Sequence, residues 1–304
     1  MSPSSGLVPP VAAQGPGRMP AAAVNAMDLR LVRRAAGALP GEHRSPGVGT
    51  GTELAQLRPY QVGDDVRMLD PAASARTGEP HVRLQVPERA LTTWVLLDRS
   101  ASMAFGTAER LKSDVADGVT EVIGRLAIRR GGRFALTTCG APADRILAPK
   151  GGRAALATMR RLVGEGVAPD GFVAPDALTH GLRRVAGLAR QPGLVVVVSD
   201  FREEGTGWRR ALRLVATRHR VLCAEVSDPR ERALPDAGTL VVIDPETGAT
   251  AEVDTSSAAV RERYAAAEAA RAAEVRDAVR RAGAQHVALS TDGDWLRALG
   301  RALA

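Results

Sequence analysis

The chain is poor in cysteine and in aromatic residues, and it has no long apolar run. Its two cysteines, Cys139 and Cys223, are too few for a disulfide framework or a structural zinc site. The longest apolar runs, such as Leu194–Val198, fall far short of the roughly 20 residues that cross a bilayer, so we expect no membrane span. Residues 1–27 lack a basic segment followed by an unbroken apolar stretch, which argues against a signal peptide and favours a cytoplasmic location.

Lysine is almost absent, although the chain is basic, with a formal net charge of +7. Lys112 and Lys150 are the only lysines among the 41 basic residues. Aromatic residues make up 3% of the chain, and no block of consecutive basic residues is interleaved with aromatic side chains that could stack on bases. The sequence therefore predicts no nucleic-acid partner.

The composition is that of a globular protein, with 45% hydrophobic residues in 304, enough to bury a sizeable core. We expect a flexible tail rich in Pro, Ala and Gly over residues 1–26. An accessory segment with an LRxYxxGDDxR block follows over residues 27–90, and it includes a short helical pattern at Asp28–Ala36. The main domain covers residues 91–304.

From Leu91 onward, strand patterns alternate with amphipathic helical patterns, which predicts an α/β fold. We expect a Rossmann-type, mostly parallel sheet with helices on both faces, and Val195–Val198 has the unbroken apolar character of a central strand. The expected strands are Thr93–Leu97, Phe134–Thr138, Arg145–Ala148, Leu194–Ser199, Val221–Val226, Leu240–Asp244 and His286–Ser290. The expected helices are Ala108–Arg129, Gly152–Val163, Ala177–Ala189, Trp208–Thr217, Ser256–Ala282 and Asp294–Leu303.

The first of these strands runs directly into a DxSxS motif, Asp98-Arg99-Ser100-Ala101-Ser102. In an open α/β sheet, ligands bind at the carboxyl ends of the strands. One carboxylate and two hydroxyls in a tight turn there suit a hard cation such as Mg²⁺. The simpler interpretation is helix capping, in which Ser102 or Thr107 caps the helix expected from Ala108.

A second carboxylate favours the metal interpretation. Asp200 follows the strand Leu194–Ser199, so it lies at the same edge of the sheet as Asp98. The sequence thus predicts an Mg²⁺ or Mn²⁺ site. Its predicted ligands are Asp98, Ser100, Ser102 and Asp200.

These ligands match the metal-ion-dependent adhesion site of the von Willebrand factor A fold, which uses DxSxS, a later Thr and a later Asp. The upstream segment LRPYQVGDDVRMLDPAASARTG resembles the bacterial family called domain of unknown function 58, in which such a block precedes a von Willebrand factor A-like domain. The resemblance runs from about Arg30 to the C-terminus. Further matches are Glu88-Arg89, Ser199-Asp200-Phe201, Asp228-Pro229, Leu234-Pro235 and Asp244–Gly248.

The chain departs from the family pattern at two places. Asp70-Pro71 stands where the family usually has Asp-Trp. The family's Thr ahead of the Ser199-Asp200-Phe201 strand is also missing, which leaves two candidates for the third ligand. Asp176 would supply a carboxylate oxygen directly, and Thr179 would approach one turn later.

The upstream block is dense in charges of both signs. Ion pairs and turn caps within the accessory segment explain such a pattern, and a partner-binding patch is the functional alternative. The residues predicted for that patch are Arg58, Asp64, Asp65, Arg67 and Arg76.

The resemblance implies a non-enzymatic, metal-dependent protein-binding module whose partner is an AAA+ ATPase of the MoxR class. The alternatives are a metal-dependent hydrolase or phosphatase that uses the same acids, and a metal-free scaffold. An enzyme would need a nucleophile or base with an orienting group, and the sequence offers no such set. Nucleotide binding is not expected either, because Gly106–Ser113 differs from a phosphate-binding loop by Leu111 in place of the second glycine.

Overall fold

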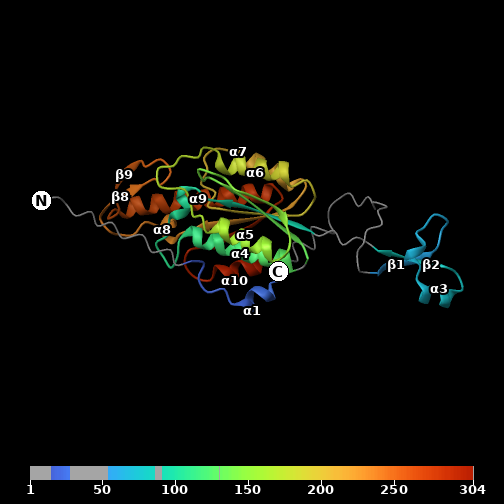
Figure 1. Cartoon of the computed structure of the whole chain (residues 1–304). Helices are drawn as coiled ribbons and strands as arrows, with labels where there is room; N and C mark the ends of the chain where they lie inside the picture. Colours follow the sequence, from blue (N-terminus) through green and yellow to red (C-terminus); the bar gives the residue numbers. More distant parts are fainter. Residues whose placement is uncertain (1–14, 28–53, 86–90, 130, 304) are drawn as a thin grey trace. The chain divides into compact units, whose positions relative to one another are not determined.

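The computed structural model describes residues 15–27, 54–85, 91–129 and 131–303. The chain divides into two compact units (Figure 1). The main unit consists of Met1–Leu39 and Leu91–Ala304, and the smaller unit of Pro40–Ala90.

The main unit contains a six-stranded sheet whose order is β10-β7-β6-β3-β4-β5. All neighbouring strands pair in parallel except β5, which lies antiparallel to β4 at one edge. This arrangement confirms the predicted α/β class with a mostly parallel sheet. The strands are β3 (Thr92–Asp98), β4 (Arg133–Cys139), β5 (Ile146–Lys150), β6 (Leu194–Ser199), β7 (Arg220–Ser227) and β10 (Gln285–Ser290).

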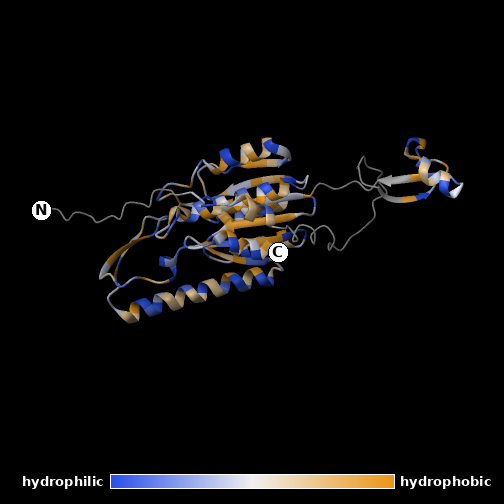
Figure 2. Ribbon diagram, turned by 90° about the horizontal axis from the view of Figure 1, so that it is seen from below, coloured by the Kyte–Doolittle hydropathy of each residue, from blue (hydrophilic) through white to orange (hydrophobic). Residues whose placement is uncertain are grey.

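Helices cover both faces of this sheet (Figure 1). They are α4 (Lys112–Arg129), α5 (Gly152–Val163), α6 (Ala177–Leu188), α7 (Gly207–Ala216), α9 (Ala258–Arg281) and α10 (Trp295–Leu303), with a short α8 (Pro229–Arg232). Alternate residues of the central strands enter opposite cores: Val95 packs with residues of α4, α5 and α10, whereas Leu96 packs with residues of α6, α7 and α9. Figure 2 shows the strands mostly in the orange of hydrophobic residues, and the helices around them carry both hydrophobic and hydrophilic residues.

The interpretation of residues 1–26 as a flexible tail is wrong for residues 15–26. A short helix, α1 (Ala21–Ala26), buries Val24, and the following Met27 joins the core around α4 and α10. The indole nitrogen of Trp295 donates a hydrogen bond of 2.9 Å to the Pro16 carbonyl. The composition concealed this contact, because two apolar side chains one turn apart are enough to dock a single helical turn. The helical pattern expected at Asp28–Ala36 lies outside the described residues.

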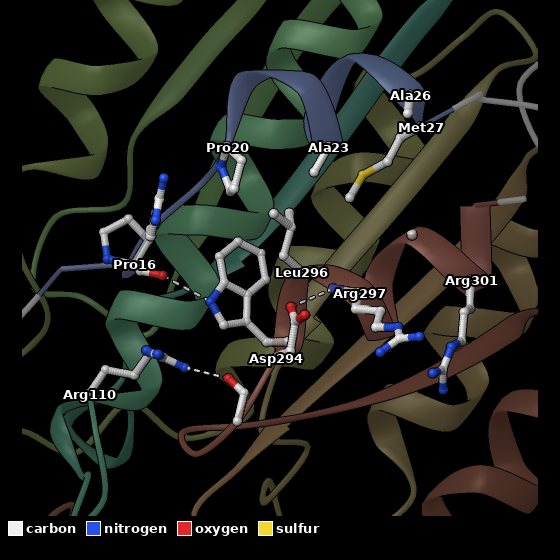
Figure 3. Close-up of a pocket in the computed structure, with 14 residues that line it drawn as sticks. Pro16, Pro20, Ala23, Ala26, Met27, Arg110, Asp294, Leu296, Arg297 and Arg301 are labelled. Carbon is white, nitrogen blue, oxygen red and sulfur yellow. Dashed lines mark hydrogen bonds between the residues drawn. The ribbon is translucent and has the colours of Figure 1, made fainter.

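A cavity of about 780 Å³ lies beside this contact, between α1 and α10 (Figure 3). Its lining is largely apolar, and four arginines stand around it: Arg18, Arg110, Arg297 and Arg301. None of the predicted metal ligands lines it.

The expected strand Leu240–Asp244 does not join the large sheet. It forms β8 (Thr239–Ile243), which pairs with β9 (Thr250–Asp254) in a separate antiparallel hairpin. The second strand of this hairpin was not predicted from the sequence. Its turn is Asp244–Gly248, in which Gly248 adopts a φ of 70° that favours glycine.

The smaller unit is built on an antiparallel pair, β1 (Leu54–Pro59) and β2 (His81–Gln85). Between these strands lie a 3₁₀ turn at Val66–Met68 and helix α3 (Pro71–Thr77). The Asp65 carboxylate caps the 3₁₀ turn and the Asp70 carboxylate caps α3.

Candidate functional site

The strand order places Asp98 and Asp200 beside each other at one sheet edge. In the sequence of the main unit, β3 is the first strand of the large sheet and β6 is the fourth, yet the two lie side by side in the sheet. From this pair, β4 and β5 continue the sheet on one side, and β7 and β10 continue it on the other, so the strand order reverses here. Ligands of open α/β sheets bind at this switch point, outside the carboxyl ends of the strands. Asp98 ends β3, and Asp200 directly follows β6.

The Asp98 carboxylate is buried and held by neutral donors. Its Oδ1 accepts hydrogen bonds from the Ser100 amide at 2.9 Å and the Ser100 hydroxyl at 2.7 Å. Its Oδ2 accepts from the Ser199 hydroxyl at 2.6 Å. The hydroxyl oxygens of Ser100 and Ser102 lie 3.1 Å apart. The DxSxS motif therefore gathers one carboxylate and two hydroxyls at one point, as the sequence predicted.

Gly140 allows the neighbouring loop to approach this motif. It has a φ of 84°, and a Cβ atom there would come within 2.8 Å of the Ser100 backbone nitrogen. The carbonyl of Cys139 accepts a 2.7 Å hydrogen bond from the Arg99 amide, which ties the loop after β4 to the motif. The Arg99 side chain pairs with Asp117 at 2.9 Å. The second residue of the motif is thus engaged with α4.

The Asp200 carboxylate has a cationic partner that was missed in the sequence. Lys112, in the first turn of α4, is fully buried, and its ammonium nitrogen lies 2.7 Å from both Asp200 Oδ2 and Glu231 Oε1. Burial alone would lower the pKa of Lys112, but the two carboxylates raise it above its ordinary value. This use of Lys112 agrees with the expectation that Gly106–Ser113 is not a phosphate-binding loop.

The two strand-end acids therefore differ in their electrostatics. Burial and the charge of Asp200 raise the pKa of Asp98 to about 6. Burial also disfavours the charge of Asp200, but the nearby Lys112 ammonium outweighs it and lowers the pKa of Asp200 below its ordinary value. Among the residues that the structure describes, Asp98 takes part in no ion pair. Lys112 therefore neutralises Asp200, whereas Asp98 has no cationic partner among the described residues.

These donors fit a divalent cation of the Mg²⁺ type. All are oxygens, and Asp98 is a buried carboxylate that a bound cation would neutralise. Within the described ranges no group of three or more His, Cys, Asp or Glu side chains is placed to hold a metal ion. The two hydroxyls and water would therefore have to complete the coordination, as is usual for Mg²⁺.

The two candidates for a third ligand lie at the start of α6. Asp176 is exposed and adopts a φ of 54°, and no hydrogen bond joins it to Asp98 or Asp200 in the described part of the chain. Thr179 is buried, and its hydroxyl donates a hydrogen bond to the Glu203 carboxylate. The role of Asp176 as a ligand stays a prediction.

The charged block of the smaller unit contains internal ion pairs and turn caps. Arg58 pairs with Asp64 at 2.7 Å, and Asp64 also accepts a hydrogen bond from the Gln61 amide. Asp65 accepts one from the Arg67 amide. These contacts match the structural interpretation of the block. The side chains of Arg67 and Arg76 are exposed, and the partner-binding patch stays a prediction.

Four residues at the site were missed in the sequence: Lys112, Ser199, Glu231 and Glu246. Ser199 had a signal, because it directly precedes Asp200. Lys112 also had one, because it is one of two lysines in a chain whose other basic residues are arginines. Glu246 lies within Asp244–Gly248, a segment that matches the family pattern, but that match does not link it to the metal site. Glu231 has no local pattern that links it to the site.

No helix in the described part of the chain is both long enough and apolar enough to cross a membrane. The cytoplasmic location expected from the sequence stays a prediction.

Comparison with known proteins identifies the family. The family profile described as "Protein of unknown function DUF58" matches residues 56–274. "Uncharacterized protein Mb1516" of Mycobacterium bovis is 40% identical over 291 residues, which cover 93% of this chain and 89% of the relative. "Uncharacterized protein Rv1480" of Mycobacterium tuberculosis gives the same identity and coverage. "Uncharacterized protein MAV169" of Mycobacterium avium is 42% identical over 131 residues, covering 43% of this chain and 72% of the relative.

Similar solved structures are more distant. BatB from Bacteroides thetaiotaomicron, a conserved hypothetical protein, is 13% identical, with a TM-score of 0.44 over 70% of this chain and 97% of that one. The SpRpn10 VWA domain is 12% identical, with a TM-score of 0.39 over 68% of this chain and 92% of that one.

Proposed function

This chain belongs to the DUF58 family, and we propose that it is a metal-dependent protein-interaction module. The observation that carries the proposal is the environment of Asp98, a buried carboxylate with no cationic partner among the described residues, at the switch point of the sheet. The residues that would hold Mg²⁺ or Mn²⁺ are Asp98, Ser100, Ser102 and Asp200, with Asp176 as the further predicted ligand.

The bound ion would supply a positive charge with open coordination positions, to which a carboxylate of another protein can bind. Residues of this chain orient and neutralise the acids that would hold the ion. Ser100 and Ser199 orient the Asp98 carboxylate. Lys112 neutralises Asp200, so the ion keeps more of its charge for an incoming acid than it would beside two uncompensated carboxylates.

For the partner, we retain the AAA+ ATPase of the MoxR class that the sequence resemblance implies. An acidic side chain on the surface of that ATPase would be the group captured. The exposed arginines of the smaller unit, Arg67 and Arg76, are available for a second contact with an acidic surface.

A metal-free scaffold is the second candidate, and the Lys112 ammonium favours it. A buried cation already pairs with one of the two strand-end acids, as a bound metal would. The two candidates differ in Asp98, whose raised pKa leaves it protonated more readily when no metal is bound. A metal-dependent hydrolase or phosphatase would use the same acids and would be detected with generic phosphate and ester substrates.

The test is a calorimetric titration of the protein with Mn²⁺ and then with Mg²⁺. We expect saturable binding at one site in the wild type and none in Asp98→Asn. Asp254→Asn is the matched control, because Asp254 is an exposed carboxylate whose hydrogen bonds go to the amide and hydroxyl of Ser256. Equal binding by the wild type and Asp98→Asn would remove the proposed site, and no binding by the wild type would favour the metal-free scaffold.

The partner is tested with the purified MoxR-class ATPase of the same organism. We expect association in Mg²⁺ and loss of association in excess chelator or in the double variant Ser100→Ala, Ser102→Ala, with unchanged circular dichroism. Association that persists in chelator would show that the partner binds elsewhere. Arg67→Ala with Arg76→Ala would then test the smaller unit.

A further inference from the structure

The β8–β9 hairpin is exposed along both strands and is held at its two ends. Val241, Val242 and Ile243 are 61%, 43% and 54% exposed, an unusual degree for three consecutive apolar residues. At the base, the buried Thr255 hydroxyl donates a 2.7 Å hydrogen bond to the Gly238 carbonyl. The middle of the hairpin therefore buries little apolar surface that would hold it against the domain.

The tip of the hairpin is anchored next to the candidate metal site. Pro245 and Glu246 are half-buried, although the residues on either side of them are exposed. The Pro245 carbonyl accepts a 2.8 Å hydrogen bond from the Gly171 amide, in the loop before α6. Figure 1 shows the hairpin at the same end of the main unit as α8, which follows the carboxyl end of β7.

The Glu246 side chain reaches the DxSxS motif. Burial raises its pKa, and the charges of Asp200 and Asp98 raise it further, while hydrogen bonding to the Ser102 side chain opposes the rise. The tip itself is rigid: the Asp244 carboxylate accepts hydrogen bonds from the Glu246 amide at 2.9 Å and from the Thr247 hydroxyl at 2.6 Å. The loop before α6 joins this tip to the DxSxS motif, because its Gly171 amide bonds to the Pro245 carbonyl and its Ala168 amide donates a 2.7 Å hydrogen bond to the Arg99 carbonyl. A carboxylate of this chain is thus held beside the site.

We propose that Glu246 is an internal competitor for the carboxylate position of the site, and that the β8–β9 hairpin must leave before a partner's acid can bind. This inference rests on the proposed function, because it assigns the regulation of the same site. Glu246 offers the same chemical group as the partner. It is carried at the tip of a hairpin whose strands are largely exposed and whose Pro245 carbonyl is bonded to the Gly171 amide. The free protein is then closed, and a partner opens it.

The expected size of the effect follows from the arithmetic of two states. A ligand that binds only the open state has its apparent affinity reduced by the fraction of molecules that are open. Minor states of proteins are commonly populated at about 0.1–10%, so removing the internal competitor should tighten carboxylate binding by about tenfold or more. The partner's carboxylate and the hairpin are then mutually exclusive, and each must weaken the other by the same factor.

The test measures acetate binding to the full chain loaded with Mn²⁺, by water-proton relaxation and by calorimetry. The variants are Glu246→Gln, which removes the charge, and Glu246→Asp, which keeps the charge on a shorter side chain. Glu252→Gln is the matched control, because Glu252 is an exposed carboxylate on β9 of the same hairpin. We expect acetate to bind about tenfold or more tightly to both Glu246 variants and to bind the control as it binds the wild type.

Hydrogen exchange at the Gly171 amide provides the structural readout. This amide is protected by the Pro245 carbonyl, so it should exchange faster when acetate occupies the site in the wild type. Tighter acetate binding by Glu246→Gln but not by Glu246→Asp would show a simple effect of charge and overturn the inference. Equal acetate affinity in all four proteins would also overturn it and leave the metal site standing. Failure of Mn²⁺ to bind the wild type and Glu246→Gln would overturn the proposed function, and the inference with it.

Discussion

The ammonium nitrogen of Lys112 lies 2.7 Å from the carboxylate of Asp200, and the lysine side chain is 0% exposed. A buried lysine is stable in its charged form only if acids surround it, and here Asp200 and Glu231 do so. The contact joins the first turn of α4, the end of β6 and α8, which are far apart in the sequence. The ion pairs of Lys112 with Asp200 and Glu231 therefore stabilise this edge of the sheet without a bound metal.

Lys112→Met should destabilise the fold strongly. The substitution leaves the buried carboxylates of Asp200 and Glu231 without their cation, and breaking a buried ion pair in this way costs about 3–5 kcal/mol. Urea unfolding would measure the loss. Lys150→Met is the natural control, because Lys150 is the other lysine of the chain and is exposed. A loss below about 1 kcal/mol for Lys112→Met would contradict the network, since surface substitutions commonly stay within about 0.5 kcal/mol.

The third ligand is tested by Asp176→Ala and Thr179→Ala. We expect Asp176→Ala to weaken Mn²⁺ binding several-fold, because it removes an exposed carboxylate that is not committed to another side chain by any hydrogen bond in the described ranges. Thr179→Ala should mainly lower the melting temperature, because it removes the hydrogen bond to Glu203. Calorimetry would measure the Mn²⁺ affinity and thermal unfolding the stability. A larger loss of Mn²⁺ affinity in Thr179→Ala than in Asp176→Ala would assign the third ligand to Thr179.

The stability of the protein should depend on pH through Asp228. Burial opposes its ionisation, but hydrogen bonds from Thr107, Thr291 and the Arg230 amide outweigh burial and lower its pKa below the ordinary value of 3.8. Since the pKa is lower in the folded state, ionised Asp228 contributes stability above about pH 4, and this contribution is lost as the pH falls through the depressed pKa.

Asp228→Asn should therefore reduce the free energy of unfolding by about 1.5–3 kcal/mol at pH 7, the range for hydrogen bonds to a charged group. The difference from the wild type should shrink below pH 4. Denaturant unfolding at pH 7 and pH 3 would measure both. A difference that stayed constant with pH would mean that the carboxylate charge is not what these hydrogen bonds stabilise.

The docking of α1 predicts a strong effect of a single charge. Val24→Asp should lower the free energy of unfolding by about 3 kcal/mol, because it removes a buried apolar side chain and places a carboxylate in the core. Ala22→Asp, at an exposed position in the same helix, should have little effect. Equal stability of the two variants would restore the interpretation of this segment as a loose tail.

Much of the fold could be predicted because its strands are nearly unmixed apolar runs. Val195–Val198 is fully buried in the middle of the sheet, as such a run requires. The adjacency of Asp98 and Asp200 followed from parallel pairing, because both acids end strands at one edge. The family was likewise evident from the motifs, and the family profile confirms it.

The remaining features depended on contacts that local patterns do not record. Glu231 lies 119 residues from Lys112 in the sequence, so its role becomes visible only when α8 is placed against α4. Residues 240–244 have the apolar character of a sheet strand, yet β8 lies in a hairpin and exposes that character to solvent. α1 was missed because two buried side chains among Pro, Ala and Gly give too weak a periodic signal.

The packing of residues 15–27 against α4 and α10 makes the main unit discontinuous in the sequence. The smaller unit is therefore an insertion between two parts of one domain, and it is tethered to that domain at both ends. A single proteolytic cut between Met27 and Leu91 would separate the chain into two fragments without freeing the first, because Val24, Met27 and Pro16 still bind the second through core packing and the Trp295 hydrogen bond. The nicked protein should migrate as one particle in gel filtration and as two fragments in denaturing gels.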